Sequence, residues 1–357
     1  MSFIEVIPEH ELESILHMIL LERERVIDEY NRKLHRYSPK LVVECENKHR
    51  TIIAYFEMKE DGTLKQHEKS IFSKRRRRKT EYNPVKIKIY NQVFDVEIPK
   101  VCPRCKSPNL NLRFIEYPKD LCLEILEAKE KIKKYESLIE MYIKDYDLYK
   151  YYLKYIKGLG IIGSAWLIWL FLKLNPQYPT KVYAYCGLYP VGYCEKCGYV
   201  VVRGFRVGMK CPKCGNELVG KLPTKKLASQ LGITFKVNYQ LMKRFRVIVD
   251  SLNVANGVYG RIFKKLRERD KMEGKKTAWV KTAKLLISHA WEVWYYLKYN
   301  EVPPKPYQFA YLLHDTYIPP LVDKFNERNT ILISLIRARG FTIEEYLDMI
   351  ENIEKYI

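Results

Sequence analysis

Four cysteines in the middle of the chain constrain its fold more than any other feature. They form two C-x2-C pairs separated by thirteen residues: Cys194, Cys197, Cys211 and Cys214. Each pair lets two thiolates face one tetrahedral ion, and the glycines that follow, Gly198 and Gly215, allow a tight knuckle. The pattern predicts a structural zinc ribbon, because four thiolates leave no coordination position open for catalysis. Two disulfides are the alternative, but cysteines paired on two knuckles fit a metal better.

A second metal site is predicted nearer the N-terminus. The run "CPRC" supplies Cys102 and Cys105, which make half of a tetrahedral set. The best candidate for the other half is Cys45-x3-His49, in "ECENKHR". These four residues would hold a second zinc across a β-rich region. The alternative is that Cys45 is a core residue and His49 a surface residue.

A glycine-rich turn precedes the most apolar stretch of the chain. Gly158-x-Gly160-x-x-Gly163 has the spacing of a dinucleotide-binding loop, but that loop needs a preceding strand and an acidic residue about twenty positions later. Here a helical pattern precedes the loop, and no acidic residue lies between Asp147 and Glu195. We therefore expect a helix-hairpin-helix, whose amides and first helical turn hold a DNA phosphate. A plain turn between two helices is the alternative.

The segment before this turn carries an uninterrupted heptad repeat. Its apolar positions alternate spacings of four and three: Leu121, Ile125, Ala128, Ile132, Tyr135, Ile139, Tyr142, Tyr146, Tyr149, Leu153 and Ile156. Such a seam predicts one long coiled-coil helix over residues 119–157, which pairs with a second copy of the chain through residues 121–156. Packing against the chain's own domains is the alternative.

Charge points to a polyanionic partner. The 357 residues include 63 Lys and Arg against 42 Asp and Glu, a net charge of +21. Residues 221–284 hold 17 basic and 4 acidic residues, whereas residues 301–357 hold 6 and 9. Because the charge is concentrated in one region, we expect DNA as the partner, with RNA as an alternative. A uniformly basic, soluble surface is the less specific interpretation.

The residues expected to contact DNA come from the glycine turn and the basic helices. We predict phosphate contacts from Lys157, Gly158, Gly160, Gly163, Lys243, Arg244, Arg246, Arg261, Lys264, Lys265 and Arg267. The run "KRRRRK", Lys74 to Lys79, is either a solvated loop or a further phosphate-contacting loop.

The remaining patterns describe an intracellular, mainly helical protein. The acidic start "MSFIEVIPEHELES" lacks the features of a secretory signal, and the longest uncharged apolar stretch has 15 residues, short for a membrane span. We expect a cytoplasmic or nucleoid-associated location. Abundant Lys, Glu, Ile and Tyr beside six Gln favour a thermophilic source.

Two stretches carry a family resemblance. "GLGIIGSAWLIWLFLKLNPQYPTKVYAYCGLYP" resembles the helix-hairpin-helix and "AYxGLxP" segment of the insertion-sequence-110-type transposases, the bridge-RNA-guided recombinases. "VYGRIFKKLRERDKMEGKKTAWVKTAKLLISHAWEVWYYL" resembles the helical end of the same domain. With the preceding heptad segment, the resemblance covers residues of about 120 to 298.

The resemblance implies a role in DNA transposition or recombination, with two departures. The family has an N-terminal ribonuclease-H-like domain, whereas the first 120 residues here form a β-rich, metal-binding pattern. The family also has a nucleophilic serine after "GLxP", in a glycine-rich setting. Thr224 and Ser229 are the only hydroxyls between Cys214 and Gln230, and the catalytic role is carried over to neither. The two open hypotheses are an active recombinase and a non-catalytic, architectural nucleic-acid-binding protein.

Together these patterns predict a mainly α fold with small β zinc-ribbon insertions. Residues 1–118 form a helix and a β-rich zinc-binding region, and residues 119–157 form the coiled-coil helix. Residues 158–300 form the helix-hairpin-helix domain with a ribbon inserted at 190–220. Residues 301–357 form a small helical tail.

Overall fold

The computed structural model confirms a mainly helical protein with small antiparallel sheets. It divides into two compact units, a β unit of Ile19–Leu138 and a helical unit of Met1–Met18 with Ile139–Ile357. The residues described are 7–59, 61–66, 81–202, 205, 208–272, 277–304 and 317–357. The predicted phosphate-contacting run Lys74–Lys79 lies outside them.

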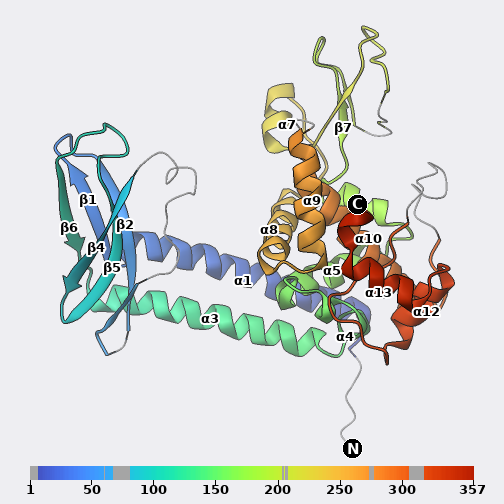
Figure 1. Cartoon of the computed structure of the whole chain (residues 1–357), viewed down its shortest axis with the longest axis horizontal. Helices are drawn as coiled ribbons and strands as arrows, with labels where there is room; N and C mark the ends of the chain where they lie inside the picture. Colours follow the sequence, from blue (N-terminus) through green and yellow to red (C-terminus); the bar gives the residue numbers. More distant parts are fainter. Residues whose placement is uncertain are drawn as a thin grey trace, which may run out of the picture. The chain divides into compact units, whose positions relative to one another are not determined.

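The β unit is built on a four-stranded antiparallel sheet and a separate hairpin (Figure 1). The sheet has the order β3-β2-β1-β6, and the hairpin pairs β4 with β5. The strands are β1 (Lys40–Cys45), β2 (Arg50–Met58), β3 (Leu64–Gln66), β4 (Tyr82–Ile89), β5 (Gln92–Pro99) and β6 (Leu110–Ile115). Sheet and hairpin share a core in which Phe56 stacks edge-on against Phe94 of β5 and Phe114 of β6.

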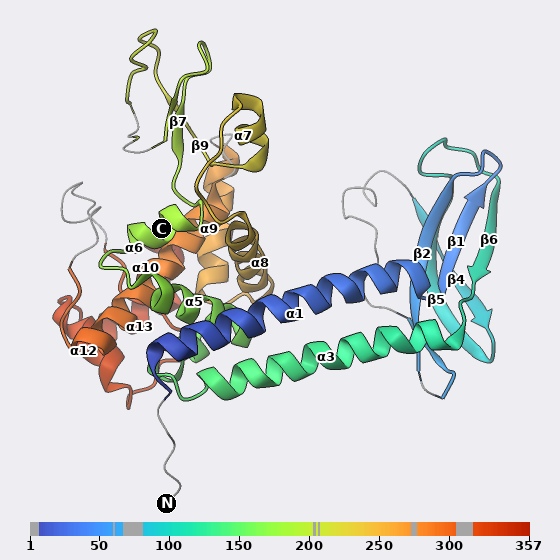
Figure 2. The ribbon, with the colours of Figure 1, turned by 180° about the vertical axis from the view of Figure 1, so that it is seen from behind.

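Two long helices, α1 (Glu9–Tyr37) and α3 (Lys119–Ile143), lie side by side and antiparallel in both views (Figures 1 and 2). Within the β unit, Arg23 of α1 pairs with Glu136 of α3, and Lys33 pairs with Glu124 at 3.0 Å. The seam positions of α3 that were expected to meet a second chain are buried or half-buried within this one. The heptad pattern is thus used inside the chain, where α1 supplies a partner.

The single helix predicted over residues 119–157 is wrong in extent, because α3 ends at Ile143. After an exposed Lys144-Asp145 turn the chain forms α4 (Asp147–Tyr151) and the 3-10 turn η1 (Leu153–Tyr155). The apolar repeat continues across this break because Leu153 and Ile156 are buried in the helical unit. The heptad repeat is therefore uninterrupted in the sequence, although one part of it packs in the β unit and the other part in the helical unit.

In the helical unit, the other elements gather around α10 (Ala278–Tyr299). This helix is buried on several sides, including Trp291 and Trp294, and it contacts α4, α5, α6, α8, α9 and α12. The elements besides α4 and η1 are α5 (Gly160–Leu174), α6 (Pro179–Tyr185), β7 (Val191–Tyr193), β8 (Val200–Val201), β9 (Val219–Lys221), α7 (Lys225–Leu231), α8 (Tyr239–Ala255), α9 (Val258–Met272), α12 (Thr330–Ala338), α13 (Ile343–Glu351) and η2 (Ile353–Lys355).

A chain of buried hydrogen bonds runs through this core. His289 of α10 lies with Nε2 3.0 Å from the carbonyl oxygen of Ile318 and Nδ1 2.8 Å from the hydroxyl of Tyr259. The Tyr259 hydroxyl lies 2.7 Å from that of Tyr152. Nε2–H therefore donates to the carbonyl, Nδ1 accepts from Tyr259, and Tyr152 donates to Tyr259. Burial lowers the pKa of His289 to about 3, because the imidazolium would lose its hydration.

This histidine makes stability depend on pH. An unfolded histidine titrates near 6.5, so below that pH the unfolded chain binds a proton that folded His289 does not. The free energy of unfolding should therefore fall between about pH 6.5 and 3, by up to about 1.4 kcal/mol per pH unit from this residue. Urea unfolding at several pH values should show a shallower dependence for His289→Gln than for the wild type.

The matched control is His10→Gln, because the His10 side chain is 82% exposed. This variant should keep the wild-type pH dependence. Identical pH dependence in His289→Gln and the wild type would contradict the assignment of a neutral, buried imidazole.

Candidate metal centres and nucleic-acid interface

The four cysteines of the predicted ribbon come together on two knuckles beside a three-stranded sheet, ordered β8-β7-β9. In the first knuckle the Cys194 N–H donates to the carbonyl of Tyr199, and the Gly198 N–H donates to the carbonyl of Cys194. The second repeats both bonds with the same offsets from Cys211. Gly198 has φ 72°, a left-handed conformation that favours glycine. Its equivalent Gly215 has φ 71°.

The four sulfurs of the ribbon have the separations of a tetrahedral site. Sγ of Cys194 lies 3.4 Å from Sγ of Cys214, and Sγ of Cys197 lies 3.5 Å from Cys211 and 3.6 Å from Cys214. Two sulfurs each about 2.3 Å from one tetrahedral Zn²⁺ lie about 3.8 Å apart, whereas a disulfide bond measures about 2.05 Å. The observed distances fit a shared metal and exclude the two-disulfide alternative for these cysteines.

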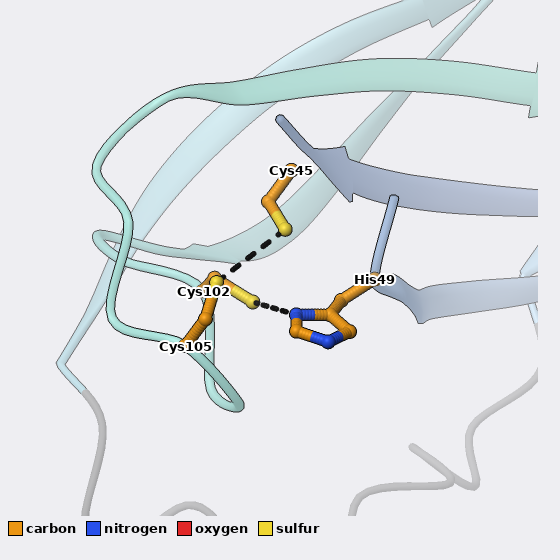
Figure 3. Close-up of side chains that lie close together, drawn as sticks. All are labelled: Cys45, His49, Cys102 and Cys105. Carbon is orange, nitrogen blue, oxygen red and sulfur yellow. Dashed lines mark hydrogen bonds between the residues drawn. The ribbon is translucent and has the colours of Figure 1, made fainter. Parts of the chain in front are cut away.

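The second predicted set also comes together, in the β unit (Figure 3). Cys45 ends β1 and His49 precedes β2, while Cys102 and Cys105 lie between β5 and β6. Sγ of Cys45 lies 3.5 Å from Sγ of Cys105, and Sγ of Cys102 lies 3.9 Å from Nδ1 of His49. All four ligand atoms lie within 4.8 Å of one another. Cys45 is buried, as the alternative had it, but half-buried His49 is no isolated surface residue, because both belong to one cluster with Cys102 and Cys105.

The Cys102 knuckle follows the ribbon pattern with one difference. The Cys102 N–H donates to the carbonyl of Ser107, and the Lys106 N–H donates to that of Cys102. Lys106 occupies the position of the ribbon glycines and has φ 64°. The Asn47 side chain and the Ser107 amide lower the pKa of the Cys105 thiol to about 6, which favours the thiolate that a metal needs.

The glycine turn is built mainly by packing. Gly158 has φ 90°, and a Cβ there would lie 2.6 Å from Cβ of Ala255 and 2.9 Å from the carbonyl oxygen of Ser251, both on α8. A Cβ on Gly163 would lie 2.8 Å from Cδ1 of Leu159. Gly160 has φ 64° and open space around it. Two of the three glycines are thus explained without a phosphate.

A carboxylate of the chain itself occupies part of this turn. Asp323 accepts the backbone N–H of Lys157 through Oδ2 and that of Val258 through Oδ1, each at 2.6 Å. Val258 begins α9, so the carboxylate lies at that helix's positive end. The Asp323 N–H in turn donates to the carbonyl of Tyr155 at 3.0 Å. The predicted anion was to bind the glycines and the first amides of α5, whereas Asp323 binds the amide before Gly158 and the first amide of α9. Phosphate binding by Gly158, Gly160 and Gly163 stays a prediction.

The predicted basic residues fall into two groups. Arg261 contacts the end of α13, where its guanidinium donates to the carbonyls of Ile350 and Glu351 and pairs with Glu354 at 3.3 Å. Lys264 donates to Oδ1 of Asn256 at 2.6 Å. These two side chains make contacts within the chain that stabilise the fold. Their position in a basic run of the sequence could not reveal that role.

The other predicted cations lie on the outside of α8 and α9. Lys243, Arg246, Lys265 and Arg267 are exposed, as is Lys157, and Arg244 is half-buried. Arg246 lies 5.4 Å from the ring of Trp279 and pairs with Asp250 at 3.6 Å, and Arg267 lies 5.5 Å from the ring of Phe263. The exposed members of this second group are accessible for phosphate contacts.

Sequence reasoning missed a set of lysines stacked on tyrosines near the ribbon. Nζ of Lys221 lies 4.2 Å from the ring centre of Tyr193, and Nζ of Lys284 lies 5.4 Å from that of Tyr189. The partners are far apart in sequence, and only the abundance of Tyr and Lys hinted at such pairs. Among the described residues, no helix has both the length and the apolar content to cross a bilayer.

Comparison with known proteins gives one partial similarity. A curated relative described as an uncharacterized ABC transporter ATP-binding protein of Methanocaldococcus jannaschii is 29% identical over 125 residues. The alignment covers 35% of the present chain and 21% of the relative, so the chain spans about one fifth of that protein's length. No protein-family model matches the chain. No solved structure matches it at a significant level.

The two cysteine clusters predict the metal content. Metal analysis of the purified chain should find two bound ions, and Cys211→Ser should retain one, because a missing thiolate opens the tetrahedron. Cys102→Ser should likewise retain one. Cys122→Ala is the control, since this buried cysteine belongs to neither cluster. Full metal content in both ligand variants would contradict the two sites.

The Asp323 contacts predict a stability loss on truncation. Asp323→Ala leaves the Lys157 and Val258 amides without their carboxylate, which should lower the free energy of unfolding by about 2 kcal/mol. Glu327→Ala is the control because it removes an exposed carboxylate from the same segment. Chemical unfolding that finds equal losses in the two variants would show that the Asp323 hydrogen bonds do not stabilise the turn.

Proposed function

We propose that this chain is a nucleic-acid-binding protein that grips the sugar-phosphate backbone of DNA through the exposed faces of α8 and α9. The observation that carries the proposal is the charge of residues 221–284, which hold 17 basic and 4 acidic residues. Exposed cations of this segment lie on neighbouring helices, since α8 contacts α9 directly. A surface of this kind attracts a polyanion by releasing its condensed counterions.

The resemblance to insertion-sequence-110-type transposases supports DNA transposition or recombination as the process. It rests on the residues quoted above, in the helical unit. The glycine turn contributes differently from the family expectation, because Asp323 engages two neighbouring amides. We assign phosphate contact to Lys157 beside the turn and to the exposed cations of α8 and α9.

The alternative function is non-catalytic binding of DNA or RNA. The two hydroxyls considered for chemistry are in ordinary settings. Thr224 caps α7 by accepting the Leu227 N–H at 3.2 Å, and Ser229 is exposed on the same helix. A cleavage assay on supercoiled and branched DNA separates the hypotheses: cleavage by the wild type that is lost in Ser229→Ala or Thr224→Ala supports a recombinase, and no cleavage by the wild type supports an architectural role.

We propose zinc as the metal of both clusters. Four cysteines, or three cysteines with one histidine, are the donor sets of structural zinc sites, and soft thiolates favour zinc over magnesium or calcium. Each set closes all four positions, so the ion would hold its knuckles together without taking part in a reaction. The ATP-binding description of the partial relative is not extended to this chain, because the phosphate-binding pattern GxxxxGK[ST] does not occur in its 357 residues.

Whether the chain forms a homo-oligomer is a separate proposal, because it no longer rests on the heptad seam. Because the α3 seam positions are buried or half-buried within the chain, we propose other surfaces for a homo-oligomer, such as that around the exposed Met141. Chemical crosslinking at several protein concentrations tests it: a constant monomer would exclude the oligomer.

The charge proposal predicts how binding responds to salt. Between about 50 and 200 mM salt, the affinity for a short DNA duplex should fall steeply, and the slope of log K against log salt measures the number of phosphate contacts. The double variant Lys243→Ala with Lys265→Ala should reduce that slope by about 2, since each lost contact removes about 0.9. Fluorescence anisotropy of labelled DNA provides the measurement.

Arg337→Ala is the control, because Arg337 is an exposed cation on α12, outside the basic segment. It should leave the slope unchanged. A wild-type affinity that does not respond to salt would exclude the proposed function.

A further inference from the structure

A groove of about 490 Å³ lies where the end of α6 and the start of α7 meet the start of α8. Its lining includes two tyrosines, two lysines and two amides: Tyr185, Tyr239, Lys225, Lys236, Asn238 and Gln240. Phe235 and Val237 complete the lining, and none of these eight residues is acidic. The groove thus combines aromatic rings with positive charge.

Packing and hydrogen bonds fix the walls of the groove. Phe235 is buried in a cluster with Val191 and Leu227, which ties the loop before α8 to α7 and to β7. The Asn238 N–H donates to the carbonyl of Tyr185 at 2.9 Å, joining the start of α8 to the end of α6. A preformed site of this kind loses little conformational entropy when a ligand enters.

The groups of the groove that could bind an anion are its lysine side chains and not the backbone amides at the start of α8. The side-chain oxygen of Asn238 accepts the N–H groups of Gln240 and Leu241 at 3.1 Å each, so the first amides of α8 are already satisfied. Lys225 and Lys236 are exposed, and Nζ of Lys225 lies 5.6 Å from the ring centre of Tyr239.

We propose that this groove holds an unpaired nucleotide of a single-stranded nucleic acid. A base would stack on the half-buried rings of Tyr239 and Tyr185, while Lys225 and Lys236 meet the adjoining phosphates. In duplex DNA the bases are stacked on one another, so the groove would contribute there through its lysines alone. The inference rests on the proposed function and extends it to strands that have been separated.

Fluorescence anisotropy with labelled oligo(dT), oligo(U) and a duplex of equal length tests the proposal. Tyr239→Leu should weaken binding of the single strand about tenfold, and Tyr239→Phe should keep it, because stacking needs the ring and not the hydroxyl. Duplex binding should change less than about twofold in either variant. Comparison of oligo(dT) with oligo(U) shows whether the strand is DNA or RNA.

Tyr178→Leu is the matched control, since Tyr178 is 53% exposed in the same unit but does not line the groove. A second variant, Lys236→Glu, changes an exposed loop residue and should also weaken single-strand binding. Photo-crosslinking of a bromodeoxyuridine oligonucleotide to the unaltered chain should label Tyr239 or Tyr185.

The outcomes separate the two proposals. The groove proposal alone is overturned if the wild type binds duplex DNA, Tyr239→Leu binds oligo(dT) and oligo(U) as tightly as the wild type does, and the crosslinks form outside the groove. Equal losses for single strand and duplex in Tyr239→Leu also overturn it. A wild type that binds no nucleic acid overturns the proposed function together with the groove.

Discussion

The burial of α10 is the constraint on which the helical unit depends. Among the described residues, α4, α5, α6, α8, α9 and α12 all pack on this helix, and each must present an apolar face or a polar group that α10 can satisfy. Glu292 of α10 is an example of a polar group that needs partners from other elements. Its buried carboxylate forms an ion pair with Arg339 at 3.0 Å and accepts a hydrogen bond from the Tyr317 hydroxyl. Burial raises the pKa of Glu292, and Arg339 opposes that rise. Such pairs fix where the C-terminal helices must lie, and hence which faces of α8 and α9 remain outside.

Asp323 binds amides beside the glycine turn, but not those of the helix that was expected to hold a phosphate. Glycines, free amides and a helix N-terminus make a site for negative charge. In this chain the Asp323 carboxylate, from a distant segment, lies at the start of α9 and at the Lys157 amide, and Gly257 leaves room for it, because a Cβ there would lie 2.4 Å from the carboxylate oxygen. The local sequence around Gly158 contains no information about Asp323, which lies more than 160 residues away. Family resemblance alone therefore could not show how this turn is occupied.

The features that sequence predicted well are those with short-range causes. The C-x2-C spacings place both thiolates of a knuckle by covalent geometry, and the Cys45-x3-His49 pattern does lie beside Cys102 and Cys105 as predicted. The β-rich region predicted within residues 1–118 follows from the dense β-branched residues of segments such as β2 and β5. Sequence could not show that α3 ends at Ile143, because two cores continue one repeat. Nor could it separate Arg261, which contacts the end of α13, from exposed Arg267, because long-range contacts decide the difference.

The pairing of α1 with α3 has a consequence for how this chain could have been assembled. The β unit is one uninterrupted segment, and near its two ends Arg23 and Glu136 are ion-paired across the antiparallel helices. A stretch whose beginning and end are neighbours can be gained, lost or exchanged by a host fold without stretching the backbone at the junction. The β module that carries the Cys45, His49, Cys102 and Cys105 cluster therefore has the construction of a transferable unit, and a short loop between the two helices would be enough to close the chain in its place.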